Sequence, residues 1–216
     1  MPLLKKIPVN NGMLILWSIR ESLEVLEQMI PEALEDPLYQ AIAHNRRRRE
    51  WLAVRLLMRE VNCPAGQLSY SENGQPRLNN PLYKHISISH SDSLAGIFLH
   101  PSQAVGLDIE QADRDFIRIE QKYLSPDERQ LAQTIPDGHG LFWCIKEAVY
   151  KLADTPGLHF AGQIRIFLQE DSKLAVTLVT GTTKTFQVNH FEIEGQLIVC
   201  LVDEKGMMFE KQESQT

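Results

Sequence analysis

The segment from Leu38 to Val61 has the residue pattern of a long helix that other parts of the chain must cover. After Glu50 most positions around this helix are apolar, and a helix with so little polar surface is stable in water only when it is buried. Asn62, Pro64 and Gly66 then end the helical pattern. A chain of 216 residues is long enough to provide the surrounding layers, as one domain or as two smaller ones.

Short strands are predicted on both sides of this helix. Strand-like runs occur at GMLILWS, HISISHS, LAGIFLH and AVGLDIE, and alternating runs from Gln163 to Val202 predict an antiparallel meander. Asn73-Gly74 is a hairpin-turn signal, because both central positions of such a turn need a positive φ angle. The last dozen residues are polar, and we expect them to lack regular structure.

Capping signals and apolar periodicity predict three further helices, two of which begin with a capping box whose acidic member is Glu21 or Glu128. These helices are expected from Ser18 to about Ile30, from Ser125 onward, and from about Leu141 to Ala153. Each half of the chain therefore mixes helices with antiparallel strands, which predicts an α+β fold. We place one α+β subdomain at residues 1–102 and a second at 103–216, although no residue-level repeat relates them.

The composition excludes several classes of protein. With 22 Lys and Arg against 28 Asp and Glu, the net charge of −6 excludes a globally basic nucleic-acid binder. Cys63, Cys144 and Cys200 lie far apart and form no C-x-x-C pair, which argues against a disulfide framework or a zinc site. No apolar run resembles a secretory signal or approaches the roughly 20 residues that span a bilayer. We therefore expect a soluble cytoplasmic protein that binds no membrane.

The strand AVGLDIE places two carboxylates on one face. With a period of two, Gly106, Asp108 and Glu110 point to the side opposite the apolar residues. Two carboxylates beside a glycine that leaves room for a ligand could hold a hard cation such as Mg²⁺. The same pattern also fits an ordinary half-buried strand with a solvated outer face.

The segment FWCIKEAVYK is predicted to be helical and gathers three charged side chains. Glu147 and Lys151 are neighbours one turn apart, and Lys146 lies about 100° round the helix from Glu147. A carboxylate beside ammonium groups can hold a metal ion and also neutralise phosphate oxygens. The alternative is a surface salt bridge of the common i,i+4 kind.

Two polar runs precede these segments. Arg46 to Arg49 spread over about 300° of a helix and so form no single face, while Arg48, Arg55 and Arg59 share a stripe. Such arginines either bind a phosphate or are solvated charges. In ISISHS the serines share one strand face and His90 points away from it, and no G-x-S-x-G motif is present, so we expect no nucleophilic serine.

Taken in order, NGQPRL, ISISHS, VGLDIE and FWCIKEAVYK, with the arginine-rich helix before them, resemble the surfactin-synthetase type, or group II, of 4'-phosphopantetheinyl transferases. The resemblance covers residues 46–151 by motif, and the pair G-x-D-x-E and W-x-x-K-E-A-x-x-K is its most specific part. It implies a pseudo-dimer of two similar α+β halves, with coenzyme A bound in the cleft between them. It also implies an enzyme of the holo-acyl-carrier-protein synthase type, which moves phosphopantetheine to a serine of an acyl or peptidyl carrier protein and releases adenosine 3',5'-bisphosphate.

By motif match, the resemblance implies that Asp108, Glu110 and Glu147 are the Mg²⁺ ligands at the diphosphate of coenzyme A. It makes Glu147 the candidate to take the proton from the carrier serine, and Lys151 the candidate to stabilise or protonate the departing phosphate. Asp108 and Lys151 would thereby contact the coenzyme as well as serve in catalysis. Lys146, next to the motif glutamate, is expected to contact the diphosphate or an adjacent phosphate.

The resemblance also implies residues on the nucleotide side of the coenzyme. Ser89 and His90 match positions that bind the nucleotide, with His90 at the 3'-phosphate. Arg46, nine residues before Arg55, matches the arginine that binds the 3'-phosphate, whereas the helical wheel favours Arg48.

The turn before the first serine strand departs from the family pattern. Many members have Gly-Lys-Pro where this chain has Gly74, Gln75 and Pro76. Gln75 can donate a hydrogen bond but carries no charge, so its grip on the coenzyme is expected to be weaker. Backbone contacts near Pro76 would survive the change.

Carrier proteins of this kind are usually acidic, as this chain is, so local charge must steer their docking. The segment RDFIRIEQKYLS mixes Arg114, Arg118 and Lys122 with apolar residues, and we expect it to be the docking element. The alternative is an amphipathic helix that covers the core.

Two other functions fit the same residues. A Mg²⁺-dependent nucleotide pyrophosphohydrolase could use the carboxylates and lysines, and a module that binds a coenzyme or a nucleic acid could use the arginine helix. We expect the transferase, with no nucleic-acid partner. A monomer is expected, because a cleft between two halves of one chain needs no second copy.

Overall fold

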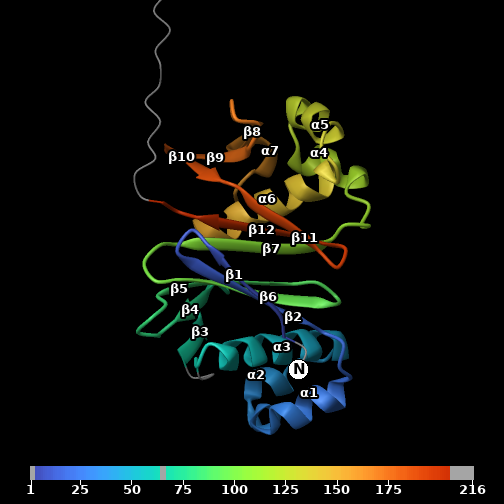
Figure 1. Cartoon of the computed structure of the whole chain (residues 1–216), viewed down its shortest axis with the longest axis vertical. Coiled ribbons are helices and arrows are strands. Elements are labelled where there is room, and N and C mark those ends of the chain that lie inside the picture. The colour runs from blue at the N-terminus through green and yellow to red at the C-terminus, as the bar shows by residue number, and fades with distance from the viewer. Residues whose placement is uncertain (1–2, 64–66, 205–216) are drawn as a thin grey trace, which may run out of the picture.

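Two antiparallel sheets lie face to face in the middle of the molecule (Figure 1), a computed structural model that describes residues 3–63 and 67–204. The first sheet has the order β1-β2-β6-β5, and the second has the order β11-β12-β7. The strands of the first are β1 (Leu3–Val9), β2 (Gly12–Ser18), β6 (Leu94–His100) and β5 (His85–His90). Those of the second are β11 (Asn189–Ile193), β12 (Gln196–Val202) and β7 (Val105–Gln111).

An apolar core fills the space between the two sheets. Leu14, Leu16 and Phe98 of the first sheet and Leu107 and Ile198 of the second are each fully buried there. The predicted alternation of β7 is confirmed, because its odd-numbered residues face this core and leave Asp108 and Glu110 on the other face.

Helices cover the outer face of the first sheet (Figure 1). They are α1 (Leu23–Met29), the 3₁₀ turn η1 (Pro31–Glu35), α2 (Pro37–Gln40) and α3 (Asn45–Glu60). Leu52, Ala53 and Leu57 of α3 are fully buried against this sheet and the shorter helices, as the apolar surface of the segment predicts. The burial of these side chains supplies the main apolar contact between α3 and the sheet.

Two predicted helix boundaries in this region are wrong. The first helix begins at Leu23, because the Ser22 hydroxyl accepts from the backbone N–H of Val25, whereas Ser18 still belongs to β2. The helix expected from Leu38 is divided into α2 and α3. The break brings the rings of Tyr39 and Trp51 to 5.3 Å, whereas one straight helix would separate residues twelve apart by about 18 Å.

Two hairpins flank this layer. Asn10 and Asn11 both have positive φ angles, 44° and 63°, and close the hairpin of β1 and β2, a turn signal that we did not use in the sequence. The predicted Asn73-Gly74 hairpin is confirmed between β3 (Leu68–Tyr70) and β4 (Pro76–Leu78). Only Gly74 of that pair has a positive φ angle, so the loop is longer than the expected two-residue turn.

The long helix α6 (Gly138–Ala153) crosses the outer face of the second sheet (Figure 1). Gly106 of β7 allows this close approach, since a Cβ atom there would lie 2.0 Å from the carbonyl oxygen of Ala148. We expected Gly106 to leave room for a ligand, and this prediction is wrong because α6 fills that space.

The remaining elements surround α6. The predicted capping box of Ser125 and Glu128 is confirmed at the start of α5 (Pro126–Gln133). Short helices are η3 (Ile117–Ile119), α4 (Glu120–Tyr123) and α7 (Phe160–Gln163). The expected meander is divided, because β8 (Ile164–Leu168), β9 (Leu174–Thr180) and β10 (Thr182–Gln187) form a third sheet apart from β11 and β12. The expectation for the last dozen residues lies outside the described residues.

Two serine hydroxyls join the two central sheets at the edge strand β7. Ser87 Oγ accepts from the backbone N–H of Leu107 at 2.9 Å, and Ser89 Oγ accepts from that of Ile109 at 3.1 Å. Both serines are buried, so water does not replace these bonds. They therefore fix where β7 lies against β5, and with it the position of Asp108.

We expect Ser87→Ala to lower the free energy of unfolding by about 1–3 kcal/mol, because it leaves the buried N–H of Leu107 without its partner. Urea denaturation followed by circular dichroism measures the change. The exposed Ser93 provides the control, and Ser93→Ala should be close to neutral. Equal stability of the two variants would show that the Ser87 bond contributes nothing to the contact between the two sheets.

Candidate functional site

The strand β7 and the helix α6 together bring five polar side chains to one place. Trp143, Glu147 and Lys151 follow each other at intervals of four residues and so share one face of α6. Lys151 Nζ lies 2.8 Å from Oδ1 of Asp108, and Trp143 Nε1 donates to Oε1 of Glu110 at 2.9 Å. Glu147 lies on the helix between these two contacts.

Apart from the weakly donating thiol of Cys144, which interacts with this carboxylate, no group in the described part of the chain satisfies one oxygen of Asp108. Its Oδ1 accepts from Lys151 and, at 3.1 Å, from Ser89. Its Oδ2 is buried and has no hydrogen-bond partner among the described residues. A buried carboxylate oxygen without a donor is unfavourable, and a bound cation would remove this cost.

The carboxylates of the site also repel one another. Burial first, and then the negative charges of Asp108 and Glu110, raise the pKa of Glu147 to about 7. A divalent cation between the three groups would neutralise this repulsion, and their oxygen atoms are the donors that Mg²⁺ prefers. The residues therefore fit a magnesium ion by their chemistry.

The side chains do not form a complete metal site as they lie. No three His, Cys, Asp or Glu side chains within residues 3–63 and 67–204 come together as a group that could hold a metal ion. Asp108 and Glu110 instead accept from cationic side chains. Both oxygens of Glu110 lie 2.8 Å from Nη1 of Arg114, so binding of a cation by all three carboxylates requires these contacts to change.

A cavity of about 640 Å³ opens beside these carboxylates and has a basic wall. Arg46 and Arg47, from the first turn of α3, line it together with Ser89, His90 and Lys151. Guanidinium groups bind phosphate through paired hydrogen bonds, so this wall can accept an anionic group of a ligand where that group replaces Asp92, which lies 2.6 Å from Nη2 of Arg46.

A buried carboxylate that we did not predict orders this wall. Glu50 is 1% exposed and accepts from Arg46 Nε at 2.8 Å and from Arg47 Nη1 at 3.0 Å. Its Oε2 also lies 3.3 Å from Nδ1 of His90, whose pKa is lowered chiefly by burial. Its position four residues after the first arginine of the run was the signal in the sequence.

The other two arginines of the run point away from the cavity. Arg48 donates to the carbonyl oxygen of Ile42 and lies over the Tyr39 ring, and Arg49 donates to the carbonyl oxygen of Ile19. The structure therefore brings Arg46 rather than Arg48 to the candidate site.

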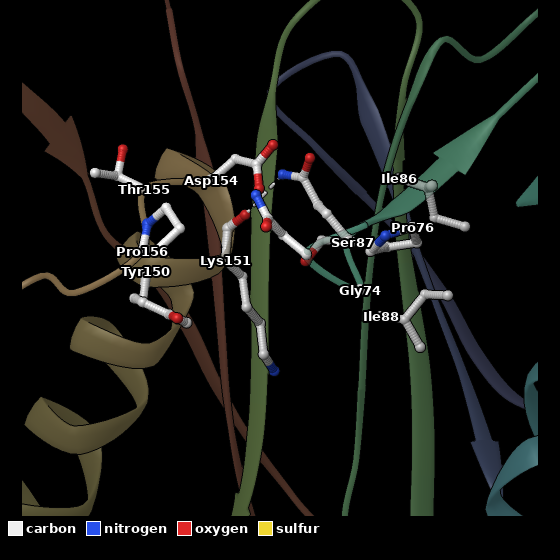
Figure 2. A pocket seen from close by; sticks show the side chains of 12 residues that line it. Gly74, Pro76, Ile86, Ser87, Ile88, Tyr150, Lys151, Asp154, Thr155 and Pro156 are labelled. Carbon is white, nitrogen blue, oxygen red and sulfur yellow. Dashed lines mark hydrogen bonds between the residues drawn. The ribbon is translucent and has the colours of Figure 1, made fainter. Parts of the chain in front are cut away.

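A second cavity, of about 210 Å³, lies where the β3–β4 hairpin meets the end of α6. Figure 2 shows its lining, with Tyr150 and Lys151 on one side and Pro76 and Ile88 on the other. Gln75 Nε2 donates to the carbonyl oxygen of Lys151 at 3.2 Å, so the glutamine caps a backbone carbonyl group in the last turn of α6. Lys151 lines both cavities and thus joins the two parts of the cleft.

The structure places Lys146 away from the site, which corrects the expectation that it contacts a phosphate. Its side chain is fully buried, and its Nζ donates to Glu128 at 2.8 Å and to the carbonyl oxygens of Phe160 and Ile164 at 3.0 and 2.7 Å. These three acceptors match the three protons of the ammonium group. Lys146 therefore ties α6 to α5 and β8 and has no proton left for a ligand.

Residues 104–202 match the family model of the 4'-phosphopantetheinyl transferase superfamily. The match covers slightly less than half of the 216 residues and includes Asp108, Glu110, Glu147 and Lys151. The arginine wall, the β3–β4 hairpin and the serine strand lie outside it. No curated protein matches the sequence. Within the described parts of the chain, no helix is long and apolar enough to cross a membrane.

Proposed function

We propose that this protein transfers the 4'-phosphopantetheine arm of coenzyme A to a serine of an acyl or peptidyl carrier protein, using Mg²⁺ and releasing adenosine 3',5'-bisphosphate. One observation carries the proposal. Asp108 and Glu110 of β7 line a cavity with a basic wall, Glu147 of α6 is close enough to feel the charge of both, and all three lie inside the segment that matches the superfamily. Such a site suits a substrate that contains a diphosphate.

Within the superfamily we place the chain in group II, as a cytoplasmic monomer of the holo-acyl-carrier-protein synthase type. Its halves, 1–102 and 103–216, would form a pseudo-dimer in which the first binds coenzyme A and the second holds the metal. The layer order supports this assignment. The helix α3 covers one antiparallel sheet, α6 covers the other, and the sheet faces that carry no helix pack against each other. The cleft with the proposed site lies between the halves.

Asp108, Glu110 and Glu147 would hold the magnesium ion, which neutralises charge on the diphosphate when it is bound. Glu147 would take the proton from the carrier serine at its carboxylate. Burial and the neighbouring carboxylates raise the pKa of Glu147 to about 7 in the metal-free protein, and a bound cation would lower this pKa, so Glu147 would be deprotonated and able to accept a proton near neutral pH. Lys151 Nζ would donate to the departing phosphate, and its contacts with Asp108 and Ser89 hold it toward the cleft.

The nucleotide half of coenzyme A would bind along the arginine wall and the hairpin. Arg46 and His90 are the proposed contacts for the 3'-phosphate, since both line the larger cavity and share Glu50 as a partner. Gln75 and Pro76 would contact the nucleotide from the smaller cavity. Ser89 is buried and would not lie on the surface of the site; it would position Asp108 and Lys151 through its hydrogen bonds to both side chains.

Mass spectrometry of several apo carrier proteins, incubated with this protein, coenzyme A and Mg²⁺, tests the proposal. We expect each accepted carrier to gain one phosphopantetheine and adenosine 3',5'-bisphosphate to appear in equal amount. Consumption of coenzyme A without a carrier would instead identify a pyrophosphohydrolase. Binding of coenzyme A without any turnover would identify a binding module.

We propose that the exposed surface after β7 receives the carrier. Ile117 is 62% exposed and the Arg118 side chain is 83% exposed, with Lys122 also exposed nearby. Phe116 is buried in the core and is not part of this surface. The exposed Asp113 and Asp115 lie on the same segment, so an acidic carrier would meet positive charge only locally, at Arg118 and Lys122 beside Ile117.

We expect Arg118→Glu to raise the KM for the carrier about tenfold and to leave the affinity for coenzyme A unchanged. Reversal of this charge repels the acidic carrier, while the guanidinium itself makes a single long contact within the described residues, to Asp115 at 4.0 Å. Steady-state kinetics with varied carrier and calorimetry with coenzyme A provide the two measurements. An unchanged KM for the carrier would exclude this surface as the docking element.

A further inference from the structure

We infer that Arg114 competes with the metal ion for Glu110, so that metal binding releases this arginine toward the carrier protein. The inference rests on the proposed function, because it assumes that Glu110 is a metal ligand. It adds a link between the metal site and the docking surface, which lie next to each other along the chain after β7.

Arg114 contacts both carboxylate oxygens of Glu110, whereas Trp143 contacts one. Nη1 of Arg114 lies 2.8 Å from both carboxylate oxygens, whereas the indole N–H of Trp143 reaches only Oε1, at 2.9 Å. The guanidinium also lies over the rings of Phe116 and Trp143, with its Cζ 5.1 and 5.8 Å from their centroids. These contacts keep the Arg114 side chain next to Glu110 and Trp143, although the side chain remains 48% exposed.

The two donors of Glu110 differ in charge, and this difference decides which one can remain. Trp143 is neutral and uses one lone pair of Oε1, so the carboxylate keeps other lone pairs for a cation. The guanidinium of Arg114 is always charged, and its repulsion of a divalent cation on the same carboxylate is strong at a separation of a few ångströms. Metal binding therefore opposes the Arg114 contact, while Trp143 can continue to orient Glu110.

A released Arg114 side chain lies on the surface proposed for the carrier. It is four residues before Arg118 and close to the exposed Ile117. Because the side chain is already half exposed, it needs no opening of the core to turn outward. A protein with its metal bound would thus present one more positive charge to an acidic carrier than a protein without it.

Titration with Mn²⁺, followed by electron paramagnetic resonance without coenzyme A or carrier, tests the competition directly. We expect Arg114→Gln to bind Mn²⁺ about threefold to tenfold more tightly than the unaltered protein, since the competing charge is lost. Arg118→Gln is the matched control, because it removes the same charge from the same segment without touching Glu110. Its affinity for Mn²⁺ should remain unchanged. Arg114→Lys, which keeps the charge, should bind Mn²⁺ nearly as weakly as the unaltered protein.

The same variants test the second half of the inference. Both Arg114→Gln and Arg118→Gln should raise the KM for the carrier, whereas only Arg114→Gln should alter the affinity for Mn²⁺. Equal Mn²⁺ affinity of Arg114→Gln and the unaltered protein would overturn the inference, as would Arg114→Lys binding as tightly as Arg114→Gln. If the unaltered protein modifies carriers and the variants give either of these results, only the proposed competition is wrong. If it modifies no carrier, the proposed function fails instead.

Discussion

Glu147→Gln is expected to lower the rate of phosphopantetheine transfer by about 10²- to 10⁴-fold, which is the usual contribution of a positioned general base. The substitution keeps the side-chain volume but removes both the charge that would bind the metal and the basic oxygen. Among the described residues, Glu147 has no hydrogen-bond or ion-pair partner. We therefore expect the free energy of unfolding at neutral pH to change little or to rise.

The pH dependence of stability separates this effect from damage to the fold. The pKa of Glu147 is raised from 4.5 to about 7 in the folded protein, so between these values the folded state binds more protons than the unfolded state. This group therefore makes the protein less stable as the pH rises through that range. In a buffer with a chelator, which keeps the site free of metal, the stability of Glu147→Gln should not show this decrease between pH 4.5 and about 7.

The exposed Glu35 offers a matched control for the kinetics. Glu35→Gln makes the same chemical change in η1, among the helices that cover the first sheet and outside both cavities, and should leave the transfer rate unaltered. Transfer by Glu147→Gln at a rate near that of the unaltered protein would remove Glu147 from both of its proposed roles, as metal ligand and as base.

Lys146→Met is expected to lower the free energy of unfolding by about 3–5 kcal/mol, because it breaks a buried ion pair by removing one partner. Glu128 is only 4% exposed, and it also accepts from the backbone N–H groups of Ser125 and Ile166, each at 2.8 Å. Without the ammonium group its charge stays buried and uncompensated. The carbonyl oxygens of Phe160 and Ile164 would lose a donor at the same time.

Chemical denaturation of Lys146→Met and of Lys122→Met, a control at an exposed lysine, measures this effect. The control should differ from the unaltered protein by less than about 0.5 kcal/mol. A stable Lys146→Met variant that binds coenzyme A poorly would contradict the structural role. That result would instead support the expectation from the motif that Lys146 contacts a phosphate of the coenzyme.

Lys146 also shows what the sequence could and could not predict. The period of the segment predicts α6, and the alternation of AVGLDIE predicts which face of β7 carries the carboxylates; both are confirmed. Each depends on neighbours within one element. The helical period places Lys151 on the face of Glu147 and Lys146 about 100° away from it, but it does not say what Lys146 meets there. Its three acceptors belong to Glu128, Phe160 and Ile164, which lie on other elements packed around α6.

The same distinction explains the residues that we missed. The contacts of Glu110 with Trp143 and Arg114 depend on how α6 lies on β7 and how the chain turns after the strand. The break between α2 and α3 lets Tyr39 pack against Trp51, a contact between two elements that no local helix signal records. Long-range packing of this kind overrides local propensity.

The most direct test of the account is the position of a metal ion in crystals grown with coenzyme A and Mn²⁺. Anomalous diffraction should show one manganese peak bound by oxygens of Asp108, Glu110 and Glu147, on the side of β7 that faces α6. The guanidinium of Arg114 should have left Glu110. A peak elsewhere, or a coenzyme diphosphate bound away from these carboxylates, would contradict the proposed site and the chemistry assigned to it.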